Sequence, residues 1–171
     1  QIAFFPFYVD QDAFQNALRT QTARREPHRI VFVGRLGLQK DIGTLIRAMR
    51  VTLARVPDAR LALVGGGPEQ NQLESLARSL GVFDSIEFLG AIPRERVAGE
   101  FARASVFALP SLYEGTCMVL HEAALARLPI VSTDNAGAHD FIEPGMQGEL
   151  VRVRDHRAMG DALADVLLDP T

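Results

Sequence analysis

The sequence contains few of the features that would place it in a disulfide-bonded, membrane-spanning or nucleic-acid-binding class. Cys117 is the single cysteine among 171 residues, which excludes an internal disulfide framework and is typical of a reducing compartment. No apolar run approaches the roughly 18 residues of a membrane-spanning helix, and we expect no signal peptide. A formal net charge of −3 argues against a nucleic-acid-binding surface. We therefore expect a cytoplasmic protein without a nucleic-acid partner.

The sequence also lacks the motifs of two common kinds of phosphate and metal chemistry. There is no GxxxxGK[ST] segment, which argues against a P-loop NTPase. The four histidines are scattered without the spacing of metal ligands, and no Asp-x-Asp motif follows a predicted strand. We therefore predict no cofactor and no essential metal ion.

Short apolar segments alternate with amphipathic ones along the chain. The apolar segments predict β-strands over 29–34, 60–64, 85–89, 105–109, 128–133 and 149–153. The segments between them place apolar residues at helical spacing, as Leu45, Ile46 and Met49 do in the first. This alternation predicts an α/β fold with a Rossmann-like, doubly wound parallel sheet. A ligand of such a sheet lies at the carboxyl ends of the strands.

The ends of several helices can be predicted from single residues. Asp41 and Asp155 are suited to begin the helices that follow them, because a short carboxylate can accept a hydrogen bond from free N–H groups. Pro68 suits a first helical position, where its missing N–H is not needed. Gly81 supplies the left-handed residue that commonly follows a helix.

The stretch Leu109–Val131, LPSLYEGTCMVLHEAALARLPIV, carries two carboxylates with seven residues between them. Glu114 lies in the turn after a strand, and Glu122 lies inside the helix that follows. A helix start favours an anion through its free N–H groups and its dipole. The residues alone leave two interpretations: contacts to ligand hydroxyls, or surface charges near a helix start. Cys117 and His121 are expected to be structural residues.

A basic loop follows the first predicted strand. Arg35 and Lys40 flank the start of the next helix, where side-chain charge and helix dipole would both stabilise a phosphate. Basic residues in a loop are also common as solvated surface charges. The residues alone leave both interpretations open.

The loop Gly65–Gly67 raises the alternative of a dinucleotide-binding oxidoreductase domain. The fingerprint of such a domain is G-x-G-x-x-G, with an acidic residue about 20 residues further on. Gln70 occupies the third glycine position, and Glu87, at the right distance, lies inside a predicted strand. We therefore favour a tight turn or a close backbone approach for these glycines.

The segments PSLYEG and HEAALARLPIVSTDNAG resemble the signature of the family-4 retaining glycosyltransferases. Those enzymes are two-domain GT-B proteins with a Glu–x7–Glu motif in their C-terminal, nucleotide-sugar-binding domain. The resemblance covers nearly the whole chain and implies the C-terminal domain of the GT-B fold. It also implies transfer of a hexosyl group from a nucleoside-diphosphate sugar to an acceptor. A nucleotide-sugar-binding module without catalysis remains an alternative.

The resemblance assigns roles to residues of this chain. It implies that Arg35 and Lys40 stabilise the departing nucleoside diphosphate, that Glu114 holds the sugar, and that Glu122 binds the ribose hydroxyls. The other implied donor contacts are to the nucleobase from Ala91 and Ile92, largely through backbone groups, and to the sugar and phosphates from the backbone of Thr116, Cys117, Met118 and Val119.

The chain departs from the family pattern at two positions. Thr116 stands where the family usually has an aromatic residue, which implies an altered sugar pocket. Arg127 stands where the family has a helix-ending glycine, so Arg127 is expected to adopt a left-handed conformation.

The resemblance also divides the chain and implies a partner domain. Residues 1–26 are expected to be an extended leading segment after the interdomain crossover, and residues 27–171 the nucleotide-sugar-binding domain. The N-terminal acceptor-binding domain of the full-length enzyme is missing, so we expect this domain alone to be inactive. A peripheral position on a membrane, if the protein takes one, is expected to come through that missing domain.

Overall fold

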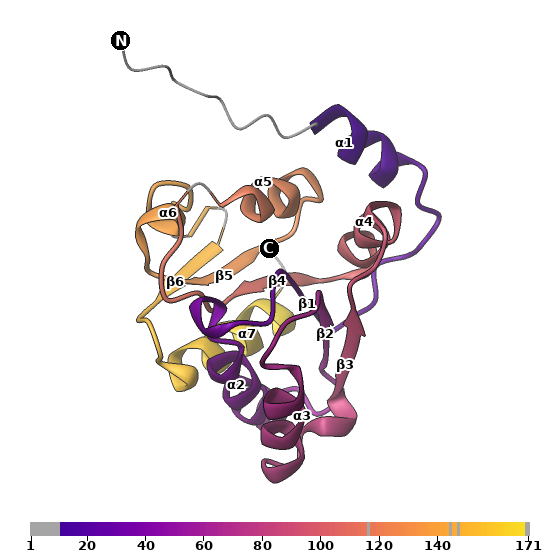
Figure 1. Cartoon of the computed structure of the whole chain (residues 1–171). Coiled ribbons are helices and arrows are strands. Elements are labelled where there is room, and N and C mark those ends of the chain that lie inside the picture. The colour runs from indigo at the N-terminus through magenta and orange to yellow at the C-terminus, as the bar shows by residue number, and fades with distance from the viewer. Residues whose placement is uncertain (1–10, 116, 144, 147, 170–171) are drawn as a thin grey trace.

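A parallel sheet of six strands forms the centre of the molecule, in the order β3-β2-β1-β4-β5-β6 (Figure 1). The computed structural model describes residues 11–115, 117–143, 145–146 and 148–169. The strands are β1 (Arg29–Val33), β2 (Arg60–Val64), β3 (Ile86–Gly90), β4 (Val106–Leu109), β5 (Ile130–Thr133) and β6 (Gly148–Val151). The doubly wound α/β fold predicted from the alternation of segments is confirmed.

Helices cover both faces of the sheet (Figure 1). One layer contains α2 (Ile42–Arg55), α3 (Gln70–Ser79) and α7 (His156–Leu168). The other contains α1 (Gln11–Arg19), α4 (Arg94–Arg103) and α5 (Met118–Leu125). Three short elements lie in connecting loops: η1 (Leu38–Lys40), η2 (Phe83–Ser85) and α6 (Ala136–His139).

The central strands are apolar because both of their faces are covered. All four residues of β4 are buried, as are the first four of β1, which is expected for a parallel sheet between two helical layers. The apolar stripe of α2 that includes Leu45, Ile46 and Met49 is fully buried on the sheet. Burial of these stripes on two faces makes one continuous core.

The order of the strands places the topological switch point of the sheet between β1 and β4. From β1 the chain adds β2 and β3 on one side, and it then returns to add β4, β5 and β6 on the other. The loops after β1 and β4 therefore diverge at the carboxyl edge of the sheet. Open α/β sheets bind their ligands at this switch point.

A buried arginine ties β1 to its neighbours at the opposite, amino-terminal edge. Arg29 is 2% exposed and contacts Glu87 at 2.8 Å, Glu100 at 2.7 Å and Glu26 at 3.4 Å. Its hydrogen bond holds the pKa of Glu87 below the ordinary value, against the opposite effect of burial. Three carboxylates thus compensate the charge that β1 carries into the interior.

Most predicted turn and cap residues behave as expected. Gly81 and Arg127 adopt left-handed conformations, with φ of 69° and 54°. Asp155 begins α7, because its carboxylate accepts a hydrogen bond from the Ala158 N–H at 2.9 Å. The prediction for Asp41 is wrong in part: it precedes α2, but its side chain accepts from the Thr44 hydroxyl at 2.7 Å and makes no cap hydrogen bond.

Several predicted boundaries need correction. Helix α3 begins at Gln70, so Pro68 lies in the preceding turn rather than at the first helical position. Strand β5 begins at Ile130 rather than 128, and β6 spans Gly148–Val151 rather than 149–153.

The leading segment is not extended throughout. Residues 11–19 form α1, whose Phe14 is buried edge-on against Phe101 of α4, with ring centroids 5.5 Å apart. Residues 1–10 lie outside the described part, and the domain boundary at residue 26 stays a prediction. Among the described helices, none is long and apolar enough to cross a membrane.

Candidate functional site

Two residues that the sequence analysis placed at one site are in contact. The ammonium nitrogen of Lys40, in the loop after β1, lies 2.5 Å from a carboxylate oxygen of Glu114, in the loop after β4. The Lys40 and Glu114 side chains are 19% and 8% exposed, so water screens this ion pair only partly. The pair therefore lies at the switch point of the sheet, between its two diverging loops.

Backbone contacts fix these two loops to each other. The Leu112 N–H donates to the Gln39 carbonyl at 2.8 Å, and the Gln39 side-chain amide donates to the Tyr113 carbonyl at 3.0 Å. Lys40 and Glu114 are neighbours of these bonded residues in the sequence. Their side chains consequently start from a braced backbone, which favours a defined geometry at the pair.

Arg35, the other basic residue predicted to bind phosphate, differs from Lys40 in having no carboxylate partner among the described residues. The Arg35 side chain is exposed, and it makes no hydrogen bond or ion pair with any residue that the structure describes. Lys40 has three donor hydrogens, so its contact with Glu114 leaves donors for another acceptor. Both cations can therefore contact an anion at the carboxyl edge.

The glycines after β2 support the Arg35 loop by close approach. A Cβ atom on Gly65 would overlap the carbonyl of Gly34, and one on Gly67 would overlap that of Leu36. The Leu36 N–H donates to the Gly66 carbonyl at 3.0 Å. The contacts of these glycines are thus to the backbone of the first loop, in agreement with the close approach expected for them.

Glu122 pairs with a different cation. Its carboxylate, 17% exposed, lies 3.8 Å from the guanidinium of Arg94, at the start of α4. Burial raises the pKa of Glu122, while the nearby Arg94 charge acts in the opposite direction. Ala91 and Ile92 lie in the loop between β3 and α4, so Arg94 links Glu122 to the loop for which a nucleobase role was predicted.

The residues around the start of α5 divide into buried and accessible ones. Cys117 is buried, and burial raises the pKa of its thiol to about 11, so the thiol stays neutral at pH 7. This fits the structural role expected for Cys117 rather than a nucleophile. Met118 and Val119 are half-buried in the first turn of α5. Thr116 lies outside the described residues.

A cavity of about 440 Å³ extends from Glu114 along the starts of α5 and α6. Its lining includes His121, Asp140 and Phe141, which the sequence analysis left without a role in the site. The His121 and Phe141 rings pack with centroids 4.7 Å apart. The position of Asp140 and Phe141 shortly after the predicted strand 128–133, and so near the carboxyl edge, was the available signal for two of these residues.

The start of α6 holds the Glu114 turn in place. A Cβ atom on Gly137 would overlap the Gly115 carbonyl and would lie 2.9 Å from the Cβ of Glu114. Asn135 caps α6 by accepting from the Ala138 N–H at 3.2 Å, and its amide donates to the Ser111 carbonyl at 3.4 Å. Glu114 is therefore positioned from both β4 and β5.

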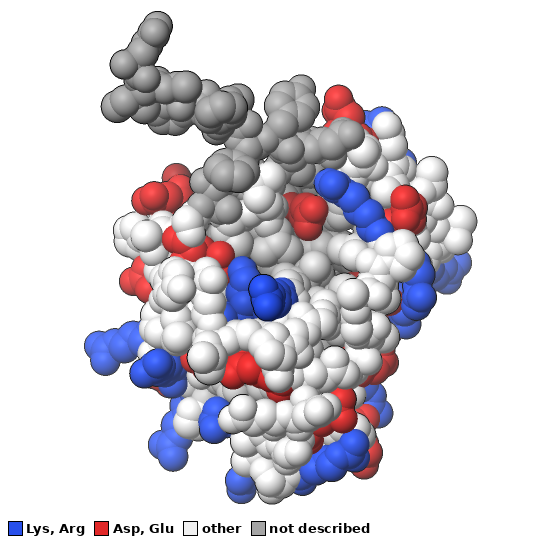
Figure 2. Space-filling view, in the orientation of Figure 1, with Lys and Arg blue, Asp and Glu red and all other residues white. Residues whose placement is uncertain are grey.

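The face shown in Figure 2 is hollowed at its centre, and both basic and acidic side chains reach the hollow. Among the described residues, no three histidine, cysteine, aspartate or glutamate side chains are arranged to hold a metal ion. At the candidate site, Glu114 pairs with Lys40 and Glu122 pairs with Arg94.

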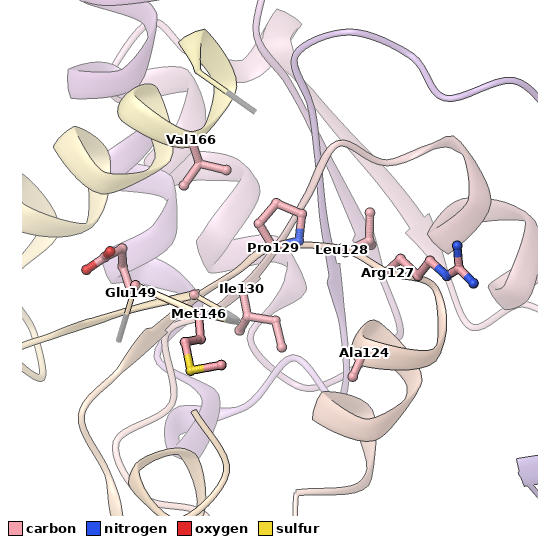
Figure 3. A pocket seen from close by; sticks show the side chains of 10 residues that line it. Ala124, Arg127, Leu128, Pro129, Ile130, Met146, Glu149 and Val166 are labelled. Carbon is pink, nitrogen blue, oxygen red and sulfur yellow. The ribbon is translucent and has the colours of Figure 1, made fainter. Parts of the chain in front are cut away.

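A separate hollow of about 320 Å³ lies at the amino-terminal ends of β5 and β6 (Figure 3). Ile130, Met146 and Val166 contribute apolar side chains to it, while the charged ends of Arg127 and Glu149 point in opposite directions. No residue with a predicted role in donor binding lines this hollow. The candidate site is therefore the carboxyl edge.

The family model described as "Glycosyl transferases group 1" matches residues 14–171. The chain belongs to this family. A GDP-mannose-dependent alpha-(1-6)-phosphatidylinositol monomannoside mannosyltransferase of Mycolicibacterium smegmatis is 36% identical over 175 residues, 95% of this chain and 46% of that protein. A D-inositol 3-phosphate glycosyltransferase of Corynebacterium jeikeium is 35% identical over 163 residues, 88% of this chain and 39% of that protein.

The fold of this glycosyltransferase-family chain is also found in solved structures. Sucrose-phosphate synthase from Thermosynechococcus elongatus superposes with a TM-score of 0.77 and 29% identity, over 92% of this chain and 40% of that one. The chain spans about half the length of the curated relatives it matches. The domain is the Rossmann-like α/β domain of the GT-B fold, as the resemblance implied. Family membership removes the oxidoreductase alternative.

Proposed function

We propose that this chain is the donor-binding half of a retaining glycosyltransferase. The full-length enzyme would transfer a hexosyl group from a nucleoside-diphosphate sugar to an acceptor. Membership of the family supports the reaction class. The single observation that carries the site assignment is the Lys40–Glu114 contact, because it brings a phosphate-binding candidate and a sugar-binding candidate together at the switch point of the sheet.

The basic residues of the first loop stabilise the leaving group in this proposal. Negative charge grows on the diphosphate as the bond to the sugar breaks. Arg35 is free of partners within the described part of the chain, so it can bind phosphate without breaking an ion pair. Lys40 is held by Glu114 and retains donors for a phosphate oxygen. Neither residue needs a metal ion to neutralise phosphate.

The carboxylates hold the hydroxyl-bearing parts of the donor. Glu114 lines the 440 Å³ cavity together with Cys117. Glu114 accepts hydrogen bonds from the sugar, and the backbone of residues 116–119 is assigned further contacts to the sugar and phosphates. Glu122 accepts from the two ribose hydroxyls, and Ala91 and Ile92 contact the nucleobase. An ionised carboxylate has only acceptor capacity, which matches hydroxyl donors. These contacts position the donor, and positioning supplies a large part of catalysis in transfer reactions.

The acceptor reaches the donor from a second domain. The relatives named above are about twice as long as this chain, which is consistent with an acceptor-binding domain elsewhere in the full-length protein. Attack on the sugar from the face of the departing diphosphate gives retention. The isolated chain binds the donor but transfers no sugar, and peripheral membrane association belongs to the full-length protein.

Calorimetry of nucleoside diphosphates tests the proposal. We expect UDP or GDP to bind the chain equally well in excess EDTA and in magnesium, and NAD to bind no better than a nucleoside. Arg35→Ala and Lys40→Ala are expected to weaken a nucleoside diphosphate at least tenfold and the matching nucleoside much less. The matched control is Arg24→Ala, which removes an exposed charge elsewhere. Loss of binding on chelation would overturn the metal-free assignment. Equal losses of the diphosphate and the nucleoside would overturn the assignment of Arg35 and Lys40 to the diphosphate.

A further inference from the structure

A second strongly charged hollow lies on the outer surface of α2 and α7, which pack side by side in one helical layer (Figure 1). We call it the α2–α7 pocket, and its volume is about 620 Å³. Its ionisable lining consists of Arg47, Arg50, Arg55, His156, Arg157 and Asp161. In Figure 2, basic side chains gather at the lower left of the molecule, over the region of these two helices.

Most of the positive charges of the α2–α7 pocket are not balanced by an ion pair with a described residue. Arg55 is neutralised by Asp165 at 2.6 Å and Asp161 at 3.7 Å. Arg50 and Arg157 make no ion pair or hydrogen bond with any residue that the structure describes, and the same holds for Arg47. A surplus of cations therefore collects in one hollow of a chain whose formal net charge is −3.

These cations lie at positions where the local electrostatic interactions are unfavourable to a positive charge. Arg157 is the second residue of α7, near the positive end of the helix dipole, where a cation is disfavoured. Arg47 and Arg50 are three residues apart on α2, so their like charges lie on neighbouring positions of the helix surface. A bound anion would relieve both repulsions.

The chemistry of the lining points to phosphate groups. Guanidinium groups present paired N–H donors that match two oxygens of one phosphate, and arginine supplies most of the cations here. The volume falls within the ordinary range for small-molecule sites. Val51 and Ala54 add apolar surface between the charged side chains, which suits a carbon skeleton.

We propose that the α2–α7 pocket binds a ligand that carries at least two phosphate groups on a carbon skeleton. This site is distinct from the donor site, since the Lys40–Glu114 pair and the 440 Å³ cavity share no lining residue with it. The ligand is either a soluble bisphosphate or the headgroup of a phosphorylated lipid. The two sources share the recognition chemistry and differ in the experiment below.

Calorimetry with fructose 1,6-bisphosphate tests the soluble source, and sedimentation with phosphatidylcholine vesicles containing phosphatidylinositol 4,5-bisphosphate tests the lipid source. The variant is Arg50→Gln with Arg157→Gln, and the control is Arg24→Gln with Arg96→Gln. All four arginines are exposed, and none has a partner in the described part of the chain. We expect at least one probe to bind with 1:1 stoichiometry, and the pocket variant to bind it at least tenfold more weakly than the control.

The outcomes separate the α2–α7 pocket from the donor site. Binding of the bisphosphate in solution supports a soluble ligand, and binding only to the vesicles supports a headgroup. Arg35→Gln is expected to leave binding of either probe unchanged. The proposal is overturned if neither probe binds, if the control loses as much affinity as the pocket variant, or if Arg35→Gln alone removes binding. Melting temperatures of all variants verify that each remains folded.

Discussion

At the scale of single residues, the two glutamates of the central motif have different surroundings and should contribute differently to donor binding. Glu114 contacts Lys40 and lines the cavity, whereas Glu122 faces Arg94. A pattern of two carboxylates with fixed spacing suggests one function for both. Their different partners support the proposed division, in which Glu114 binds the sugar end and Glu122 the nucleoside end of the donor.

The role of Glu122 can be tested with a 2′-deoxy ligand. Hydrogen bonds to a charged group contribute about 1.5–3 kcal/mol. The 2′-deoxy nucleoside diphosphate should therefore bind about tenfold or more weakly to the wild type, because ~1.4 kcal/mol corresponds to a factor of ten. Glu122→Ala should abolish most of this difference, and Glu114→Ala should preserve it. A ribo/deoxy ratio that is the same in the wild type and Glu122→Ala would refute the assignment.

The ratio of the affinities for the ribo and 2′-deoxy ligands should also depend on pH. Burial raises the pKa of Glu122, so its carboxylate takes up a proton at a higher pH than an exposed glutamate with the ordinary value of 4.5. A protonated carboxyl accepts fewer hydrogen bonds. The ribo/deoxy ratio should consequently fall as pH is lowered through a window above 4.5. In Glu122→Gln the ratio should not change with pH, and titration of the phosphates cancels because both ligands carry them.

At the scale of elements, the candidate site depends on the contact of α6 with the turn after β4. Gly137→Ala would press a methyl group against the Gly115 carbonyl. Overpacking of this kind costs about 1–3 kcal/mol. The melting temperature should fall by roughly 2–12 °C, since 1 kcal/mol corresponds to about 2–4 °C in a chain of this size. Nucleoside diphosphate binding should weaken together with it.

Gly66→Ala is the matched control for Gly137→Ala. A Cβ atom on Gly66 would meet nothing within 4 Å, and its φ is not positive. This variant should melt within about 2 °C of the wild type. Equal destabilisation by the two alanines would show that loss of glycine, rather than the clash with the Glu114 turn, is responsible.

The sequence predicts the elements of this fold better than their ends. Strand and helix order follow from apolar spacing, which is a property of each segment by itself. The left-handed backbone conformation of Arg127 could also be predicted, because it depends on the position of the residue at the end of a helix. The boundary of α3 does not, because Pro68 suits either a turn or a first helical turn and tertiary contacts decide between them.

Only part of the candidate site could be predicted, because some of its contacts depend on tertiary packing. The resemblance placed Lys40 and Glu114 at one edge, and the parallel topology brings their loops together. The pairing of Glu122 with Arg94 depends on how α4 and α5 pack, which no local pattern specifies. His121 entered the cavity lining by the same packing, and a lone histidine in a helix carries no signal for it.

At the scale of the whole molecule, the Arg29 network should make stability depend on acid pH. The hydrogen bond from Arg29 lowers the folded-state pKa of Glu87, so this stabilisation is complete above the unfolded-state value and is lost as pH falls through the folded-state value, below 4.5. Glu87→Gln should lower the free energy of unfolding by about 1 kcal/mol at pH 7, a modest amount because the side chain is partly exposed.

Urea unfolding at two pH values checks this prediction. The difference between the wild type and Glu87→Gln should shrink at a pH well below 4.5, where the wild-type carboxylate is also protonated. Glu95→Gln is the control, because Glu95 is an exposed glutamate of α4 whose side chain makes no ion pair with a described residue. An equal effect of Glu87→Gln at both pH values would mean that packing, rather than charge, accounts for the loss.

The identity of the cation in the Lys40–Glu114 pair has a further consequence. Lys40 is the only lysine in the sequence, since every other basic side chain of the Lys and Arg set is an arginine. Its ε-amino group is therefore the one side-chain primary amine in the sequence that an amine-directed reagent can modify. Reductive methylation with ¹³C-formaldehyde would introduce a single side-chain NMR resonance, located between the two loops of the candidate site. The chemical shift of that resonance would report directly whether the contact with Glu114 opens when a nucleotide binds.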